Sequence, residues 1–112
     1  MLEADLRGII LKRHPMIENH SELKAILRKA VIHTDELGTL APSFDLPRII
    51  RPQLDFISQF LKEDRVPASE ESARINIGVL AIRNFDESDP EYANRLKALD
   101  YAFKNWEQLS KT

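Results

Sequence analysis

Helical periodicity is the feature that most constrains the fold of this 112-residue chain. Apolar residues recur at intervals of three and four along most of the sequence, the spacing that gathers side chains on one face of an α-helix. No segment shows the strict alternation of apolar and polar residues that is typical of a half-buried strand. The pattern therefore predicts an all-α fold, and we expect a compact antiparallel bundle of about five helices.

Length and residue types narrow the range of functions. A chain of 112 residues falls within the commonest size of one domain, about 100–150 residues, so we expect residues 1–112 to form a single helical domain. The sequence contains no cysteine, which excludes disulfides and thiolate-bound zinc. Its three histidines lack the i, i+4 spacing of a helical metal pair, and no glycine-rich phosphate loop is present. We therefore expect no metal and no cofactor.

Charge and hydropathy bear on partners and location. Sixteen basic and eighteen acidic side chains give a net charge of -2, which argues against direct binding to nucleic acid. No apolar run approaches the ~20 residues that span a bilayer, so we expect no membrane partner. The first residues also lack the basic and apolar regions of a secretory signal, which favours a cytoplasmic location.

The first two helices are predicted from their apolar stripes and from the residues that flank them. One spans about residues 2–14 and ends at Pro15, because proline disfavours helical geometry in the residue before it. Its apolar face consists of Leu2, Leu6, Ile9 and Ile10. The next helix begins near Ser21, a favourable N-cap, and ends at Gly38, a favourable residue for a helix C-terminus.

The third helix begins at Asp45 with Pro47 in its first turn, and we expect a kink or a short break at Pro52. A fourth helix begins at Ser69 and continues through residues 75–82, which, apart from Asn76, are apolar and point in nearly every direction around the axis. Such a helix is usually buried on most sides, so we expect it to be the central helix.

Gly78 lies inside this fourth helix and predicts the close approach of a neighbouring backbone. The fifth helix begins at residues 88–91, either with Ser88 and Glu91 as a capping box or with Asp89 before Pro90. Its buried seam comprises Tyr92, Leu96, Leu99, Phe103 and Trp106. Two aromatic residues fall off the predicted stripes and are therefore candidates for exposed contact residues, namely Phe56 and Tyr101.

Acidic residues are concentrated in one part of the chain. Residues 63–91 contain eight acidic and three basic side chains, a net charge of −5, whereas the flanking parts are slightly basic. Acidic residues in first helical turns complement the helix dipole and add solubility, which is one interpretation. The other is an acidic face that attracts a basic partner.

Residues 75–91 read INIGVLAIRNFDESDPE, and they carry a resemblance to a known family. Gly78 lies in an apolar helix, an aliphatic–alanine pair and a polar pair follow, and Phe85 precedes an acidic turn that ends in Asp89-Pro90-Glu91. This pattern resembles the small all-helical immunity proteins that neutralise NAD(P)+ glycohydrolase effectors of type VI secretion. The similarity extends over about residues 52–112.

The resemblance implies a protein that is not an enzyme. It implies binding to a cognate protein toxin, whose active site the immunity protein blocks. The acidic stretch fits this role, and we expect the partner-binding residues to be Glu63, Asp64, Glu70, Glu71, Arg74, Asp86 and Glu87. Four residues match the family pattern but are expected to be structural, setting the corner between the fourth and fifth helices: Gly78, Phe85, Asp89 and Pro90.

The sequence is compatible with several alternatives. The toxin is either an NAD(P)+ glycohydrolase or a nuclease, whose basic substrate site would suit an acidic inhibitor. A helical adaptor or regulatory subunit that docks on another protein is a second possible function, and it would use the same acidic face. An enzyme with a pair of catalytic carboxylates is a third possible function. A homodimer is compatible with such a bundle.

Overall fold

The computed structural model describes residues 17–111, so the helix predicted at residues 2–14 lies outside the described part. Within that part the chain is helical and forms no strand, which confirms the all-α prediction. The elements are α2 (His20–Leu40), α3 (Leu46–Glu63), α4 (Ser69–Ser72), α5 (Ile77–Asn84), α6 (Pro90–Lys104) and a 3-10 turn, η1 (Trp106–Gln108).

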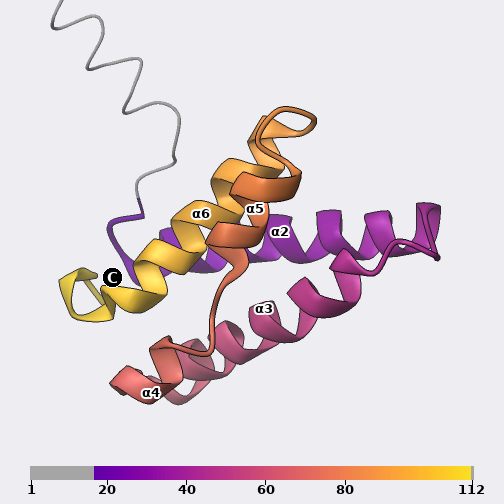
Figure 1. Cartoon of the computed structure of the whole chain (residues 1–112). Helices are drawn as coiled ribbons and strands as arrows, with labels where there is room; N and C mark the ends of the chain where they lie inside the picture. Colours follow the sequence, from indigo (N-terminus) through magenta and orange to yellow (C-terminus); the bar gives the residue numbers. More distant parts are fainter. Residues whose placement is uncertain (1–16, 112) are drawn as a thin grey trace, which may run out of the picture.

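The longer helices form two antiparallel hairpins (Figure 1). The first hairpin consists of α2 and α3, and the second consists of α5 and α6. Because α6 also packs against α2, it lies between α5 and the first hairpin. Eight of its fifteen residues are buried. The central helix is therefore α6, and the prediction that residues 75–82 form the central helix is wrong.

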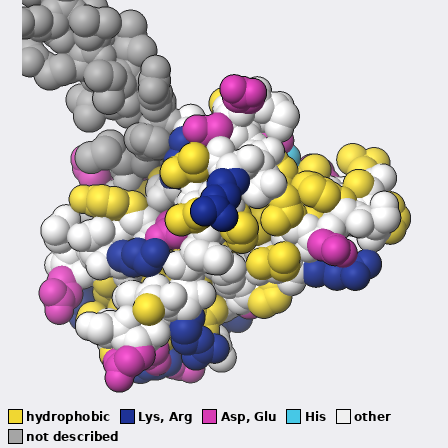
Figure 2. Space-filling model, in the orientation of Figure 1, with side chains coloured by type: hydrophobic (Ala, Val, Ile, Leu, Met, Phe, Trp, Pro, Cys, Tyr) yellow, Lys and Arg dark blue, Asp and Glu magenta, His cyan; other side chains and the backbone are white. Residues whose placement is uncertain are grey.

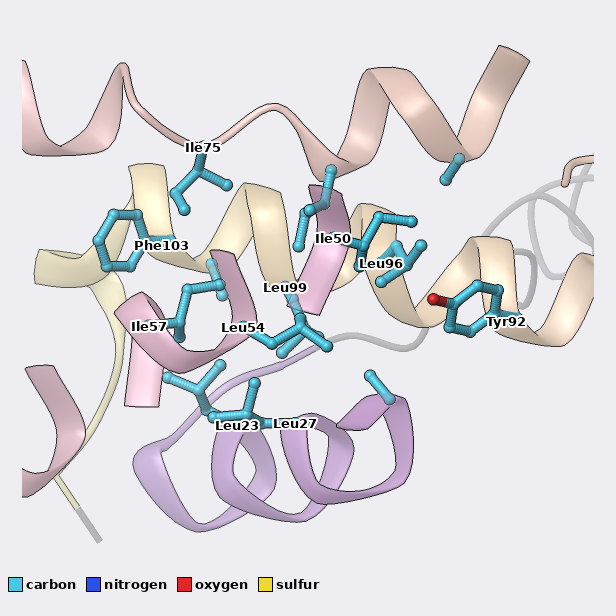
Figure 3. Packing of buried hydrophobic residues seen from close by; sticks show 14 of the residues in the cluster. Leu23, Leu27, Ile50, Leu54, Ile57, Ile75, Tyr92, Leu96, Leu99 and Phe103 are labelled. Carbon is cyan, nitrogen blue, oxygen red and sulfur yellow. The ribbon is translucent and has the colours of Figure 1, made fainter. Parts of the chain in front are cut away.

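The core is one cluster of apolar side chains contributed by both hairpins (Figure 3). Its large, fully buried members are Leu23, Ile50, Leu54, Ile57, Phe60, Ile75, Ile77, Tyr92, Leu96, Leu99 and Phe103. The predicted seam of the fifth helix is confirmed, because all of its residues from Tyr92 to Trp106 are buried. These seam residues belong to the same buried cluster as apolar residues of α2, α3 and α5, and the burial of this cluster favours folding.

Helix α2 begins earlier and ends later than predicted. Its N-cap is Asn19 and not Ser21, because the Asn19 side chain accepts a hydrogen bond of 2.8 Å from the Glu22 amide. Gly38 lies inside the helix, and the C-cap is Ala41. Since Gly38 does not adopt a positive φ, nothing in its backbone ends the helix there.

Helix α3 is continuous through Pro52, so the predicted break is absent. Asp45 occupies the N-cap position, although its side chain makes no capping hydrogen bond, and Pro47 lies in the first turn as predicted. The carbonyl that Pro52 leaves without an intrahelical donor belongs to Arg48, an exposed residue. The helix ends at Glu63, and its C-cap residue, Asp64, adopts a left-handed conformation with φ 51°.

The predicted fourth helix is divided into α4 and α5 by residues 73–76. Long-range hydrogen bonds hold this connection: the Asn76 amide donates to Gln53 Oε1 at 2.8 Å, and Gln53 Nε2 donates to Asn76 Oδ1 at 2.7 Å. Lys104 Nζ donates to the Ile75 carbonyl at 2.9 Å. Because partners on α3 and α6 satisfy these groups, the chain leaves the helix and inserts Ile75 into the core.

Gly78 does meet a close neighbour, but the neighbour is a side chain and not a backbone. Its amide donates a hydrogen bond of 2.8 Å to Asp100 Oδ2 on α6. A Cβ atom at residue 78 would lie 3.0 Å from that oxygen. Asp100 therefore caps the first turn of α5 from another helix, and Gly78 provides the space for it.

The start of α6 follows one of the two predicted alternatives. Asp89 is the N-cap and accepts from the Tyr92 amide at 3.4 Å, and Pro90 is the first helical residue. Asp89 also contacts α2, because its Oδ2 lies 2.8 Å from His33 Nε2. The His33 ring stacks on Tyr92 at 4.3 Å, so this corner joins the two hairpins.

Candidate partner-binding surface

The first group of predicted contact residues lies where α3 ends and α4 begins. Arg65 joins two of its acids: Nε lies 2.9 Å from Glu63 Oε1, and Nη1 lies 3.1 Å from Glu71 Oε2. The guanidinium also lies 4.2 Å above the ring of Phe60, which fixes its position against the core. Two of the predicted contact acids are therefore held by one basic side chain.

Glu71 also completes the first turn of α4. Its Oε1 accepts a hydrogen bond of 2.8 Å from the Ala68 amide. This hydrogen bond, followed by the one from Arg65, lowers the pKa of the Glu71 carboxyl. Both contacts hold Glu71 in place within its own chain.

Asp64 and Glu70 complete this first acidic group. Asp64 Oδ2 lies 3.7 Å from Lys111 Nζ, in an exposed pair. Glu70 is exposed and forms no ion pair with any residue in the range 17–111. Within the described part of the chain, its charge is therefore the one in this group that no neighbouring base offsets.

Arg74 follows α4 and covers an aromatic side chain. Its guanidinium lies 4.3 Å from the centre of the Phe56 ring. Phe56 is only half-buried, but it also packs against Phe60 and Phe103, with ring centres 5.1 and 5.8 Å away. Phe56 is therefore part of the core edge, and the prediction that it is an exposed contact residue is wrong.

The second group of predicted residues lies at the corner between α5 and α6. Asp86 Oδ1 accepts from Lys97 Nζ at 2.6 Å, whereas Glu87 is exposed and has no ion pair within the described part of the chain. Phe85 is buried and meets Tyr92 edge-on, with ring centres 5.0 Å apart. The contacts of Phe85, like those of Asp89 and Gly78, are made to other parts of the same chain.

The two groups lie at opposite ends of the face that Figure 2 shows. Acidic side chains appear over α4 at the bottom and over the α5–α6 corner at the top. Residues 73–76 and α5 run between these ends (Figure 1). The structure thus does not bring the seven predicted residues together. Among residues 17–111, one acid in each group forms no ion pair, namely Glu70 and Glu87.

An apolar groove between α5 and α6 was not predicted from the sequence. We define this α5–α6 groove by Ile17, Val79, Ile82, Ala98 and Tyr101, which line a cavity of about 510 Å³. Tyr101 is 66% exposed, as predicted, and Val79 and Ile82 are also exposed. The signal for the groove was the i, i+3 spacing of Val79 and Ile82, which forms a second apolar stripe on the side of α5 away from Ile77 and Ala81.

Within residues 17–111, the chain forms a small helical bundle with charged clusters and an apolar groove on its surface. No helix in this range is long and apolar enough to cross a membrane.

Comparison with known families identifies the class of protein. The Tsi6 family model matches residues 22–105, and the chain belongs to this family. Tsi6 is the family of type VI secretion immunity proteins for the NAD(P)+ glycohydrolase effector Tse6. The immunity proteins of this family are not enzymes. No curated protein and no solved structure matches the chain.

Proposed function

We propose that this protein binds the catalytic domain of its cognate type VI effector and blocks the active site, without catalysing a reaction itself. Family membership carries the proposal, because the match covers residues 22–105 and so includes helices α2 to α6 almost completely. The proposed effector is an NAD(P)+ glycohydrolase, the activity for which the family provides immunity. We place the encounter in the cytoplasm, and fractionation of cells distinguishes this from the periplasm.

The proposed contact surface extends between the two acidic groups. Glu70 and Glu87 are the strongest candidates among the seven predicted residues, because no neighbouring base offsets their charges in the described part of the structure. Exposed charges at the edge of an interface act mainly on the rate of association. Glu71, Asp86 and Arg74 support this surface by fixing its shape through their internal contacts.

Neutralisation requires tight binding, because one free effector molecule turns over many substrate molecules. A nanomolar dissociation constant corresponds to about −12 kcal/mol. Interfaces of about 1,600 Å² reach this affinity when shape and charge are complementary. A bundle whose parts are joined by hydrogen bonds at Asn76 and Asp100 and by the 2.8 Å contact between His33 and Asp89 offers a preformed surface, which limits the entropy lost on binding.

Inhibition of the effector tests the proposal. The catalytic domain is taken from the effector encoded beside this protein, and its rate of NAD+ hydrolysis is measured at increasing concentrations of the immunity protein. We expect complete inhibition near one equivalent. A variant with Glu70→Lys and Glu87→Lys should need a higher concentration, whereas Glu36→Lys, an exposed residue of α2, should behave as the wild type. Full hydrolytic activity in the presence of excess wild-type protein would contradict the proposal.

A further inference from the structure

A further cavity lies between α2 and α3, at the end of the first hairpin where α2 begins and α3 ends (Figure 1). Its volume is about 380 Å³. It is separate from the α5–α6 groove, and none of the seven predicted contact residues lines it. We define this α2–α3 pocket by its polar lining, which consists of His20, Ser21, Lys24, Ser58, Lys62 and Lys111.

The charged lining of the pocket is entirely basic. Within residues 17–111, three lysines line it and no acidic side chain does, although the whole chain has a net charge of -2. Lys24 and Lys62 form no ion pair with any residue in that range. Lys111 Nζ lies 3.7 Å from Asp64 Oδ2, but an exposed pair of this kind contributes little to stability. A cleft lined by charges of one sign attracts ions of the opposite sign, so the pocket favours an anion.

Two hydroxyl groups line the same pocket, one from each helix. Ser21 lies in the first turn of α2, and Ser58 lies in α3, one turn before Lys62. Neither hydroxyl forms a hydrogen bond with another residue in the described part of the chain. Hydroxyl and ammonium groups are both hydrogen-bond donors, and lysine is a common partner of phosphate. The donors available in the pocket therefore suit an oxyanion.

The apolar part of the lining joins the pocket to the core. Leu27 is 5% exposed and belongs to the core cluster, and the partly buried Leu61 packs against that cluster. At the rim, the His20 ring lies 5.2 Å from the ring of Trp106, and the His20 amide donates to the Ser110 carbonyl at 2.9 Å. The pocket is therefore preformed, which limits the entropy lost when a ligand is bound.

We propose that the α2–α3 pocket binds a phosphate group, with its three lysines as the cationic partners and its two serine hydroxyls as further donors. A phosphate monoester carries a charge of about −1.5 to −2 at pH 7 and three strong acceptor oxygens, so donors on both helices reach it at once. A carboxylate has a single charge and two oxygens, and it matches three lysines less well. The group belongs either to a free phosphate ion or to a nucleotide. This inference does not depend on the effector or on the proposed function.

Nuclear magnetic resonance of the full 12.9 kDa chain, titrated with sodium phosphate at an ionic strength held constant with sodium chloride, tests the proposal. We expect saturable shifts of the amides of Ser21, Lys24, Ser58 and Lys62, with a dissociation constant of about 1 mM or below. A Lys24→Gln, Lys62→Gln variant should bind phosphate at least about tenfold more weakly, because two charged donors are lost. Lys29→Gln is the matched control, since Lys29 is an exposed base of α2 that does not line the pocket, and it should bind as the wild type.

A second titration, with ADP, distinguishes the two sources of the phosphate group. Binding tighter than that of inorganic phosphate, with additional shifts of the Leu27 and Leu61 methyl groups, would support the proposal with a nucleotide as the ligand. Binding no tighter than that of inorganic phosphate, without those methyl shifts, would support it with the free ion as the ligand.

Three results would overturn the proposal. The first is a set of shifts that does not saturate, or that sodium chloride alone reproduces at equal ionic strength. The second is saturable binding that maps to other residues or that is undiminished in the Lys24→Gln, Lys62→Gln variant. The third is a pocket that ignores phosphate and ADP and responds only to the effector domain, which would assign it to a protein partner. Inhibition of the effector is measured separately, so its failure would leave this proposal standing.

Discussion

Replacing Asp100 with alanine tests how the second hairpin is held together. Asp100 is 7% exposed, its Oδ2 accepts from the Gly78 amide at 2.8 Å, and its Oδ1 lies 2.8 Å from Lys104 Nζ. The N-cap residue of α5, Asn76, makes no side-chain capping hydrogen bond. Hydrogen bonds to charged groups contribute about 1.5–3 kcal/mol, and truncation here also leaves a buried amide unsatisfied. We therefore expect Asp100→Ala to lower the free energy of unfolding by about 2–3 kcal/mol.

Urea denaturation followed by circular dichroism and by the fluorescence of Trp106 measures this loss. Asp100→Asn keeps an acceptor for the Gly78 amide and removes the charge, so its loss should be smaller, about 1 kcal/mol. Asp86→Ala is the matched control, because it removes a carboxylate that pairs with a lysine on the surface, a contact that typically contributes up to about 1 kcal/mol. An Asp100→Ala protein no less stable than the Asp86→Ala protein would refute this account of the α5–α6 contact.

Three further predictions concern the core, the pH dependence and the charged surface. Gly78→Leu should lower the free energy of unfolding by roughly 1–3 kcal/mol, because even its Cβ would lie 3.0 Å from Asp100, and an unchanged urea midpoint would contradict this. Burial raises the pKa of Tyr92, so the tyrosine loses its proton more readily in the unfolded state, and the free energy of unfolding should fall as the pH rises above about 10. The free energy of unfolding of Tyr92→Phe should decline less between pH 8 and 11. A decline equal to that of the wild type would exclude this cause. Glu70→Lys should slow association with the effector domain several-fold at low salt and leave the free energy of unfolding within about 0.5 kcal/mol of the wild type. Glu71→Lys should also destabilise the fold, because Glu71 closes the first turn of α4. Stopped-flow association rates equal to the wild type for both variants would show that another face is used.

Periodicity was sufficient to predict the parts of the fold that one helix determines by itself. The seam from Tyr92 to Trp106 is buried along its whole length, and the Asp89-Pro90 start of α6 is visible in the sequence. The separation of α4 from α5 was not predictable in this way, because it depends on Gln53, which lies 23 residues before its partner Asn76. A helical pattern contains no information about such a long-range partner.

The sequence was sufficient to predict that the contact surface is acidic, but not which of its acidic side chains are paired with a base. The acidic stretch is evident in the sequence, yet Arg65 offsets Glu63 and Glu71, and Lys97 offsets Asp86. These pairs depend on the turn after α3 and on the packing of α6 against α5. The exposed stripe of α5 was missed for a related reason. An apolar residue such as Ile82 is expected inside, and only the position of α6 shows that this side of α5 is left open.

Calorimetric titration of the effector catalytic domain, made inactive by substitution of a catalytic residue, tests the central claim most directly. The partner is the domain encoded beside this protein, and the titration yields affinity and stoichiometry together. The proposed function predicts one-to-one binding with a dissociation constant in the nanomolar range or below, corresponding to about −12 kcal/mol or stronger. Absence of binding at micromolar concentrations of both proteins would contradict the claim that this protein neutralises that effector by binding it.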